Sequence, residues 1–120
     1  MNKPNIEDIY PLSSLQQGIL FHSLSLPNSV IYVSQFCYKL DNSLNLSILK
    51  QAWQQIINRH SILRTAFYWK QRSDPFQVVY REAQLPWEEK DWCHLSSEEQ
   101  QIFLENFLKQ DYQSLFDNPV

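Results

Sequence analysis

The hydrophobic pattern of this chain switches between the helical and the strand period, and this switching constrains the fold more than any other feature. Three segments have the helical period: the segment that begins at Ser13, residues 46–60 and residues 97–115. Three segments alternate as strands do: residues 31–40, 63–69 and 76–81. An extended lead-in over residues 1–12 precedes them. The sequence therefore predicts an α+β fold, with a mixed sheet and helices packed on it.

Capping residues mark where the predicted helices begin. Ser13 with Gln16, and Ser96 with Glu99, each form a capping box, in which side chain and backbone satisfy amide donors reciprocally. Asn45 is a favourable N-cap for the middle helix. A polar loop joins the last two predicted strands, which indicates a hairpin with a loop longer than the tight turns.

The aromatic content is high for a sheet of three strands. Aromatic residues make up 14% of the 120 residues, and a sheet of this size is thin. We therefore expect further chain, or another subunit, to cover part of the aromatic surface.

Composition excludes several classes of function. The single glycine, Gly18, leaves no glycine-rich phosphate loop. The net charge is −3 without a basic stripe, so nucleic acid is not an expected partner. The sequence shows no secretory signal and no apolar run of roughly 20 residues, which predicts a cytoplasmic protein without membrane contact. Cys37 and Cys93 are expected to be buried or half-buried thiols in a reducing compartment.

The titratable residues form no metal-ligand pattern. His22, His60 and His94 lack the spacing of metal ligands, and we expect no metal site. A Ser-His-Asp arrangement stays open at this level, because such triads assemble in space. Gly18 has two interpretations, close helix packing or room for a ligand. Arg64 is expected to face solvent or an acid across a cleft; solvent is favoured, and partial burial would require a carboxylate partner.

Two motifs resemble those of condensation domains in nonribosomal peptide synthetases. The segment Arg59 to Phe67, RHSILRTAF, matches the second core motif, R-H-x-x-L-R-T-x-F, at every fixed position. The segment Tyr10 to His22, YPLSSLQQGILFH, resembles the first core motif, Y-P-L-S-P-x-Q-x-G-x-L-F-H, with Ser14 in place of the proline. The motifs stand in the family's order and separation, and the resemblance covers essentially the whole chain.

The resemblance implies a fold similar to chloramphenicol acetyltransferase, in which two subdomains form a V around a tunnel. Carrier domains would deliver thioesters on 4′-phosphopantetheine arms, and no cofactor would be bound directly. The family's third motif, H-H-x-x-x-D-G, supplies the catalytic histidine and does not occur in the 120 residues. We therefore expect residues 1–120 to be the N-terminal part of a condensation domain, truncated before this motif and inactive alone.

The resemblance also implies roles for individual residues, none of them catalytic. Three would support the active-site region: Arg59, His60 and Arg64. Three would line the acceptor side: Gln16, Gly18 and His22. Arg64 is further expected to pair with the aspartate of the third motif.

Two other functions stay open. The product of a truncated or split gene could be a non-catalytic module that docks a carrier domain or complements the missing remainder of the domain. A coenzyme A-dependent acyltransferase of the same fold would share the histidine motif, but the full first motif favours the synthetases, with Gln16, Gly18 and Phe21-His22. The donor and acceptor amino acids and the stereochemical subclass are not readable from this sequence.

Overall fold

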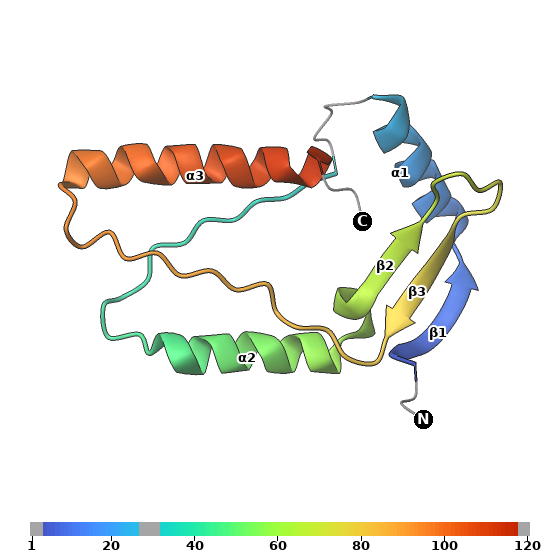
Figure 1. Ribbon diagram of the computed structural model, residues 1–120, viewed down its shortest axis with the longest axis horizontal. Helices are drawn as coiled ribbons and strands as arrows, with labels where there is room; N and C mark the ends of the chain where they lie inside the picture. The colour runs from blue at the N-terminus through green and yellow to red at the C-terminus, as the bar shows by residue number, and fades with distance from the viewer. Residues whose placement is uncertain (1–3, 27–31, 118–120) are drawn as a thin grey trace. The chain divides into compact units, whose positions relative to one another are not determined.

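The computed structural model of the chain describes residues 4–26 and 32–117. Its elements are β1 (Ile6–Pro11), α1 (Ser14–Ser25), α2 (Leu46–Arg59), the 3₁₀ helix η1 (Ser61–Arg64), β2 (Thr65–Tyr68), β3 (Phe76–Tyr80) and α3 (Ser97–Asp117) (Figure 1). The chain divides into two compact units, a larger one that extends to Pro86 and a smaller one that begins at Trp87. The helices and the small sheet confirm the predicted combination of α and β elements.

The larger unit contains a three-stranded sheet in the order β1-β3-β2 (Figure 1). The β2–β3 hairpin is confirmed, with Tyr68 paired to Phe76 and Thr65 to Val79. Both described pairings are antiparallel, whereas the sequence predicted a mixed sheet. The loop between Tyr68 and Phe76 is too short for the crossover that a parallel pair needs, and β1 runs antiparallel to β3 on its other edge.

The third strand of the sheet is the lead-in rather than residues 31–40. The lead-in was predicted to be extended, and β1 within it pairs with β3 from Ile6 to Pro11. Residues 32–40 form no ladder with any described strand. Phe36 and Tyr38 stack ring on ring with centroids 6.3 Å apart, as side chains two positions apart do on an extended chain. The segment is therefore locally extended, as its alternation indicates, but a strand also needs a partner for its backbone groups.

The predicted helix starts are confirmed. The Ser13 amide donates to Gln16 Oε1 (2.8 Å), and the Gln16 amide donates to Ser13 Oγ (3.2 Å). Ser96 and Glu99 make the same reciprocal pair at 2.9 and 3.2 Å. Asn45 Oδ1 accepts from the Ile48 amide at 3.2 Å. After α2, the chain forms η1 before it becomes extended, so β2 begins two residues later than the predicted strand.

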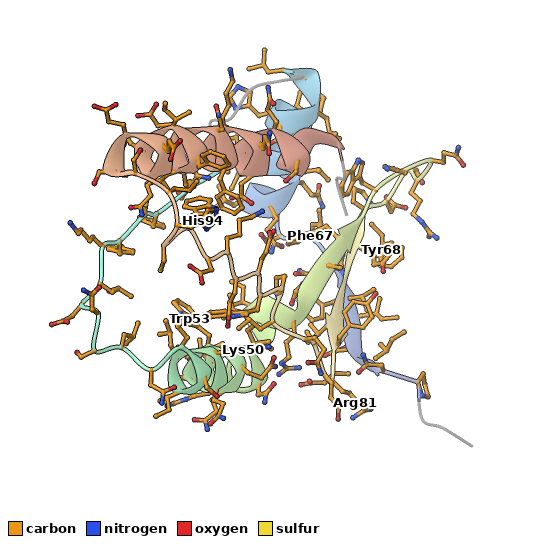
Figure 2. The ribbon with its side chains drawn as sticks, turned by 60° about the vertical axis from the view of Figure 1, so that its left-hand side comes forward. Lys50, Trp53, Phe67, Tyr68, Arg81 and His94 are labelled. Carbon is orange, nitrogen blue, oxygen red and sulfur yellow. The ribbon has the colours of Figure 1, made fainter. Side chains whose placement is uncertain are left out.

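The buried core of the larger unit is small. The buried apolar residues among those described are Leu12, Ile57, Val78 and Val79. Helix α1 has no buried residue, and many large apolar side chains are exposed, up to 79% for Ile62. Phe67 and Tyr68 project to opposite sides of β2, so each face of the sheet carries one of these rings (Figure 2). What covers these rings in the working protein stays a prediction.

In the smaller unit, α3 packs against the segment that leads into it. The Trp92 and Phe103 rings lie 6.0 Å apart, and Lys90 Nζ lies 5.5 Å from the Phe107 ring centroid. Gln100 Nε2 donates to the Trp92 carbonyl at 3.0 Å. Across the described ranges, no helix combines the length and the apolar character that a membrane span requires.

Shortening Ile57 tests the importance of the small core. Ile57 is 8% exposed on α2, so Ile57→Ala should lower the free energy of unfolding by about 2–4 kcal/mol through lost burial and a cavity. Ile48 lies on the same helix and is 63% exposed, so Ile48→Ala should change the free energy of unfolding by less than about 0.5 kcal/mol. Chemical denaturation measures both values. Equal losses would show that α2 is not anchored through Ile57.

Candidate functional site

The densest polar network of the larger unit surrounds Arg64. This residue ends η1, and its side chain is 7% exposed. The favoured prediction, that Arg64 faces solvent, is therefore wrong, because the 3₁₀ turn replaces the strand geometry on which that prediction depended. The accompanying requirement for a carboxylate is confirmed, since Glu7 Oε2 lies 2.8 Å from Arg64 Nη1.

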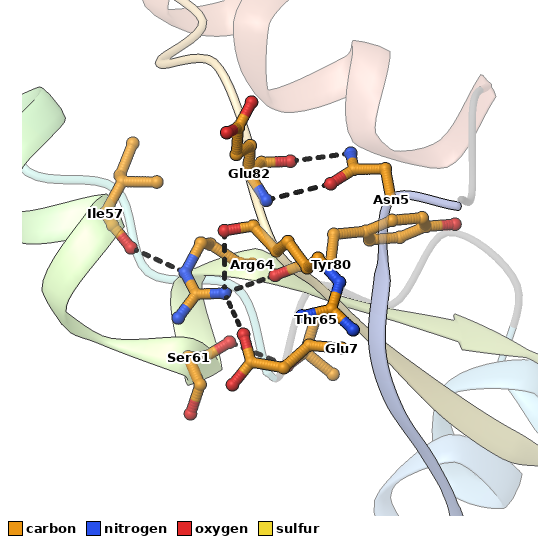
Figure 3. Close-up of polar contacts among 9 residues, drawn as sticks. Asn5, Glu7, Ile57, Ser61, Arg64, Thr65, Tyr80 and Glu82 are labelled. Carbon is orange, nitrogen blue, oxygen red and sulfur yellow. Dashed lines mark hydrogen bonds and ion pairs between the residues drawn. The ribbon is translucent and has the colours of Figure 1, made fainter. Parts of the chain in front are cut away.

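The guanidinium of Arg64 joins three segments that are distant in sequence (Figure 3). Its Nε donates to the Ile57 carbonyl in α2 at 3.1 Å. Its Nη1 donates to Glu7 Oε2 in β1 at 2.8 Å. The same Nη1 also donates to the carbonyls of Tyr80 and Arg81 at the end of β3. The side chain therefore fixes the end of the central strand against both β1 and α2.

Two amide side chains hold the backbone that continues from β3. Asn5 Nδ2 donates to the Glu82 carbonyl (2.9 Å), and the Glu82 amide donates to Asn5 Oδ1 (3.0 Å) (Figure 3). Gln54 Nε2 donates to the Ala83 carbonyl, and the Leu85 amide donates to Gln54 Oε1, both at 2.8 Å. Each amide replaces the hydrogen bonds that a neighbouring peptide group would provide. Asn5, Glu7 and Gln54 were not identified from sequence; the need of a buried Arg64 for an acid was the one available signal.

The neighbouring motif residues Arg59 and His60 lie outside this network. Both are exposed, and Arg59 is the last residue of α2. His60 acts through its backbone: its amide donates to Ile56 O and its carbonyl accepts from the Leu63 amide, both at 3.0 Å. The structure thus brings neither side chain to the guanidinium of Arg64 within the described ranges.

Gln16, expected on the acceptor side, joins α1 to the centre of the sheet. Gln77 Nε2 donates to Gln16 Oε1 at 3.1 Å and to the Pro11 carbonyl at 3.2 Å. Gln16 also lines an open cavity of about 300 Å³, together with apolar residues that include Phe67 and Trp69. Gln16 therefore offers a polar group at the wall of an otherwise apolar hollow.

Gly18 and His22 lie further along α1. A Cβ at Gly18 would meet no described atom within 4 Å, so close helix packing, the first interpretation of this glycine, is not seen there. His22 Nδ1 lies 2.8 Å from the Tyr32 hydroxyl, with the two rings edge to face at 5.6 Å. The three residues expected on the acceptor side thus lie along α1, and among the described residues Gln16 and His22 contact different partners.

The described residues contain no group of three or more His, Cys, Asp or Glu side chains placed to hold a metal. Tyr68 and Tyr80 share a hydrogen bond between their hydroxyls on one face of the sheet. This bond, followed by desolvation, raises the pKa of Tyr80. Tyr80 therefore stays protonated near neutral pH and does not provide a general base.

The two cysteines differ from the prediction, because both Cys37 and Cys93 are exposed. A local turn places Cys93 against Asp91, whose Oδ1 accepts from the Cys93 amide at 2.9 Å. The hydrogen bond from the thiol to the Asp91 carboxylate raises the pKa of Cys93 and lowers that of Asp91. A thiol held protonated in this way is a poor nucleophile at neutral pH.

Most of the chain matches known proteins of one family. The family model of the condensation domain matches residues 6–118. A linear gramicidin synthase of Brevibacillus parabrevis is 46% identical over 112 residues, covering 93% of this chain and 2% of that protein. A plipastatin synthase of Bacillus subtilis (strain 168) is 39% identical over 112 residues, which cover 92% of this chain and 3% of that protein. Malpinin synthetase of Mortierella alpina is 47% identical over 87 residues, covering 72% and 1%. The chain thus spans a very small part of the length of these relatives.

Replacing Gly18 tests the open space beside α1. Gly18→Ala should raise the free energy of unfolding by about 1 kcal/mol, because alanine favours a helix interior and nothing described obstructs its Cβ. Gln55→Ala, at an exposed position of α2, is the control and should change the free energy of unfolding by less than about 0.5 kcal/mol. Urea denaturation measures both. A loss of stability in Gly18→Ala would show that a neighbour fills this space.

The Cys93 thiol should become more reactive when Asp91 loses its charge. Asp91 raises the pKa of Cys93, so less of this thiol is thiolate at a fixed pH. Asp91→Asn should therefore lower the pKa of Cys93 and speed its alkylation by iodoacetamide at pH 8 by about a few-fold. Peptide mass spectrometry follows Cys93 and Cys37 in the same sample. Cys37 is the internal control, and its rate should not change. Slower or equal alkylation of Cys93 would contradict the proposed effect of Asp91.

Proposed function

The chain belongs to the condensation domain family, and on that premise we propose that it forms part of a domain that makes peptide bonds in nonribosomal peptide biosynthesis. The match of the family model over residues 6–118 is the observation that carries the proposal. The substrates would be aminoacyl or peptidyl thioesters on the 4′-phosphopantetheine arms of carrier domains. The chain itself would bind no cofactor directly.

The reaction is the aminolysis of a thioester. The amine nitrogen of the acceptor attacks the donor carbonyl, the carbon–nitrogen bond forms, and the carbon–sulfur bond breaks to release the carrier thiol. The proton lost by the amine ends on the thiol or on solvent. Such a step needs a neutral amine held at the carbonyl carbon, and a base near it assists. The histidine motif assigned to that role does not occur in the 120 residues, so these residues would contribute the support around it.

Arg64 is the residue best suited to a supporting role. Its side chain is fixed by hydrogen bonds to α2, β1 and β3, and only 7% of that side chain is exposed to solvent. We propose that it supports the active-site region and pairs there with the aspartate of the third motif. Arg59 and His60 would contribute by shaping the turn that delivers Arg64. This role is supported by the buried position of Arg64.

The acceptor side is proposed to lie along α1. Gln16 lines the apolar cavity between α1 and β2, Gly18 leaves open space beside the helix, and His22 presents an imidazole one turn further on. These features fit the passage of an extended thioester arm, which is narrow. The wider fold is proposed to be similar to chloramphenicol acetyltransferase, and the α+β architecture of the larger unit supports that proposal.

Exposed apolar side chains favour a second candidate, a docking or complementation module without activity of its own. Phe36 and Tyr38 are 73% and 76% exposed on an unpaired extended segment. Such surface is typical of sites that meet another polypeptide.

Reconstitution with loaded carrier domains tests the proposed function. The condensation domain that contains this sequence should convert a donor thioester and an acceptor thioester into a carrier-bound dipeptide, detected by mass spectrometry. Arg64→Ala should reduce the rate by about tenfold or more, because the support of the active-site region is lost. Arg72→Ala is the control; Arg72 stacks on the Phe76 ring at 4.6 Å, away from this network.

Two results would contradict the proposal. No dipeptide from the unaltered domain, with carriers that are active in a parallel reaction, would exclude peptide-bond formation and leave the docking module. Dipeptide formed by residues 1–120 alone would contradict the expectation that the third motif is required.

A further inference from the structure

The strand β1 contains an irregularity at Glu7. Its register with β3 pairs Asp8 with Val79 but Ile6 with Tyr80. A regular antiparallel ladder would pair Glu7 with Tyr80, so Glu7 is the additional residue of a β-bulge. A bulge changes the direction of a side chain relative to its strand, and bulges are frequent beside active sites. Here the redirected side chain is the one that contacts Arg64.

Glu7 supplies the negative charge in the Arg64 network. The other acceptors of this guanidinium are backbone carbonyls, which are neutral. Among the described residues, Glu7 makes the one ion pair with Arg64. A buried cation without a counter-ion is strongly unfavourable, and carbonyl dipoles compensate it only in part. The carboxylate of Glu7 is therefore what makes this orientation of a charged Arg64 stable.

One nitrogen of the Arg64 guanidinium, Nη2, makes no hydrogen bond to a described residue. Nε donates to one carbonyl, and the two hydrogens of Nη1 face three acceptors. Nη2 carries two further hydrogens, has no hydrogen bond to a described residue, and is the guanidinium nitrogen without a dashed line in Figure 3. Because the guanidinium is planar and its other edge is fixed, the direction in which Nη2 donates is also fixed.

We propose that Glu7 is a positioning residue for the condensation reaction. The bulge directs its carboxylate to Nη1 of Arg64, and this contact orients the guanidinium so that Nη2 donates in one direction to an acceptor beyond the described residues. Glu7 itself touches no substrate and acts through Arg64. The inference rests on the proposed function, because the supporting role of Arg64 is part of it.

The test uses Glu7→Gln in the condensation domain that contains this sequence. Glutamine keeps the size and one acceptor oxygen of Glu7 but removes its charge. We expect kcat for dipeptide formation to fall by about tenfold or more, since small misplacements at a reacting centre are costly. KM for both loaded carriers should stay within about twofold, because only uniform binding of substrate would change KM alone. Glu7→Asp keeps the charge and should recover part of kcat.

Two controls separate positioning from stability. Asp8→Asn makes the same change of charge at the next residue, whose carboxylate accepts from the Ile9 amide at 2.8 Å, and kcat should stay within about twofold. Val79→Ala shortens a core residue that is 3% exposed, and should lower Tm while kcat stays near that of the unaltered domain.

Each outcome decides between the two explanations. The inference is overturned if Glu7→Gln keeps kcat within about twofold, or if Val79→Ala loses as much kcat for an equal loss of Tm. If Glu7→Gln does not fold, Glu7→Ala, which also removes the charge, decides: a folded variant with kcat within about twofold overturns the inference, and one with kcat reduced by about tenfold or more supports it. An unaltered domain without activity would refute the proposed function itself, whereas an active domain indifferent to Glu7 refutes only the role of Glu7.

Discussion

The arrangement of the larger unit depends on one buried positive charge. The apolar core comprises few residues, and α1 buries none, so apolar burial alone leaves the relative position of the segments weakly determined. Arg64 connects α2, β1 and the end of β3 through hydrogen bonds and one ion pair. Because an unmatched charge in this position would be unstable, these three segments have to meet there. The Arg64 network thus adds a polar connection between segments that the small apolar core holds together only in part.

The second motif is a turn whose consecutive residues perform different physical tasks. Arg59 ends α2, and the His60 backbone closes the helix and opens η1. Thr65 Oγ1 donates to the Ser61 carbonyl at 2.8 Å, which closes the turn from its other end. Arg64 then enters the interior. A pattern that reads as one functional signature in sequence is therefore mostly a device for directing a single side chain.

Local features of this fold could be predicted from sequence, and the features that depend on distant segments could not. The starts of α1 and α3 are fixed by side chains three residues apart, so Ser13 and Ser96 identified them correctly. The pairing of β1 with β3 joins residues about seventy positions apart, and no local pattern of Ile6 to Pro11 indicates it. A separation of 57 positions likewise concealed Glu7 as the partner of Arg64, although the need for some acid was predictable. Residues 32–40 were predicted to be a strand from their local alternation. A strand also needs a neighbouring strand from elsewhere in the chain, which local alternation cannot indicate.

The reciprocal amides of Asn5, Gln54 and Gln77 have a consequence for how the unit responds to its surroundings. Each bonds to neighbouring segments through both its nitrogen and its oxygen, as a peptide group does. Asn5 donates once and accepts once, whereas the nitrogens of Gln54 and Gln77 each donate twice. Amides do not titrate and carry no net charge, so these joints are indifferent to acidity and ionic strength. Among the described residues of the larger unit, Arg64 and Glu7 form the ion pair that connects segments. The hydrogen bonds of these three amides should therefore hold the backbone next to β1 and β3 in the same way over a wide range of acidity and salt concentration.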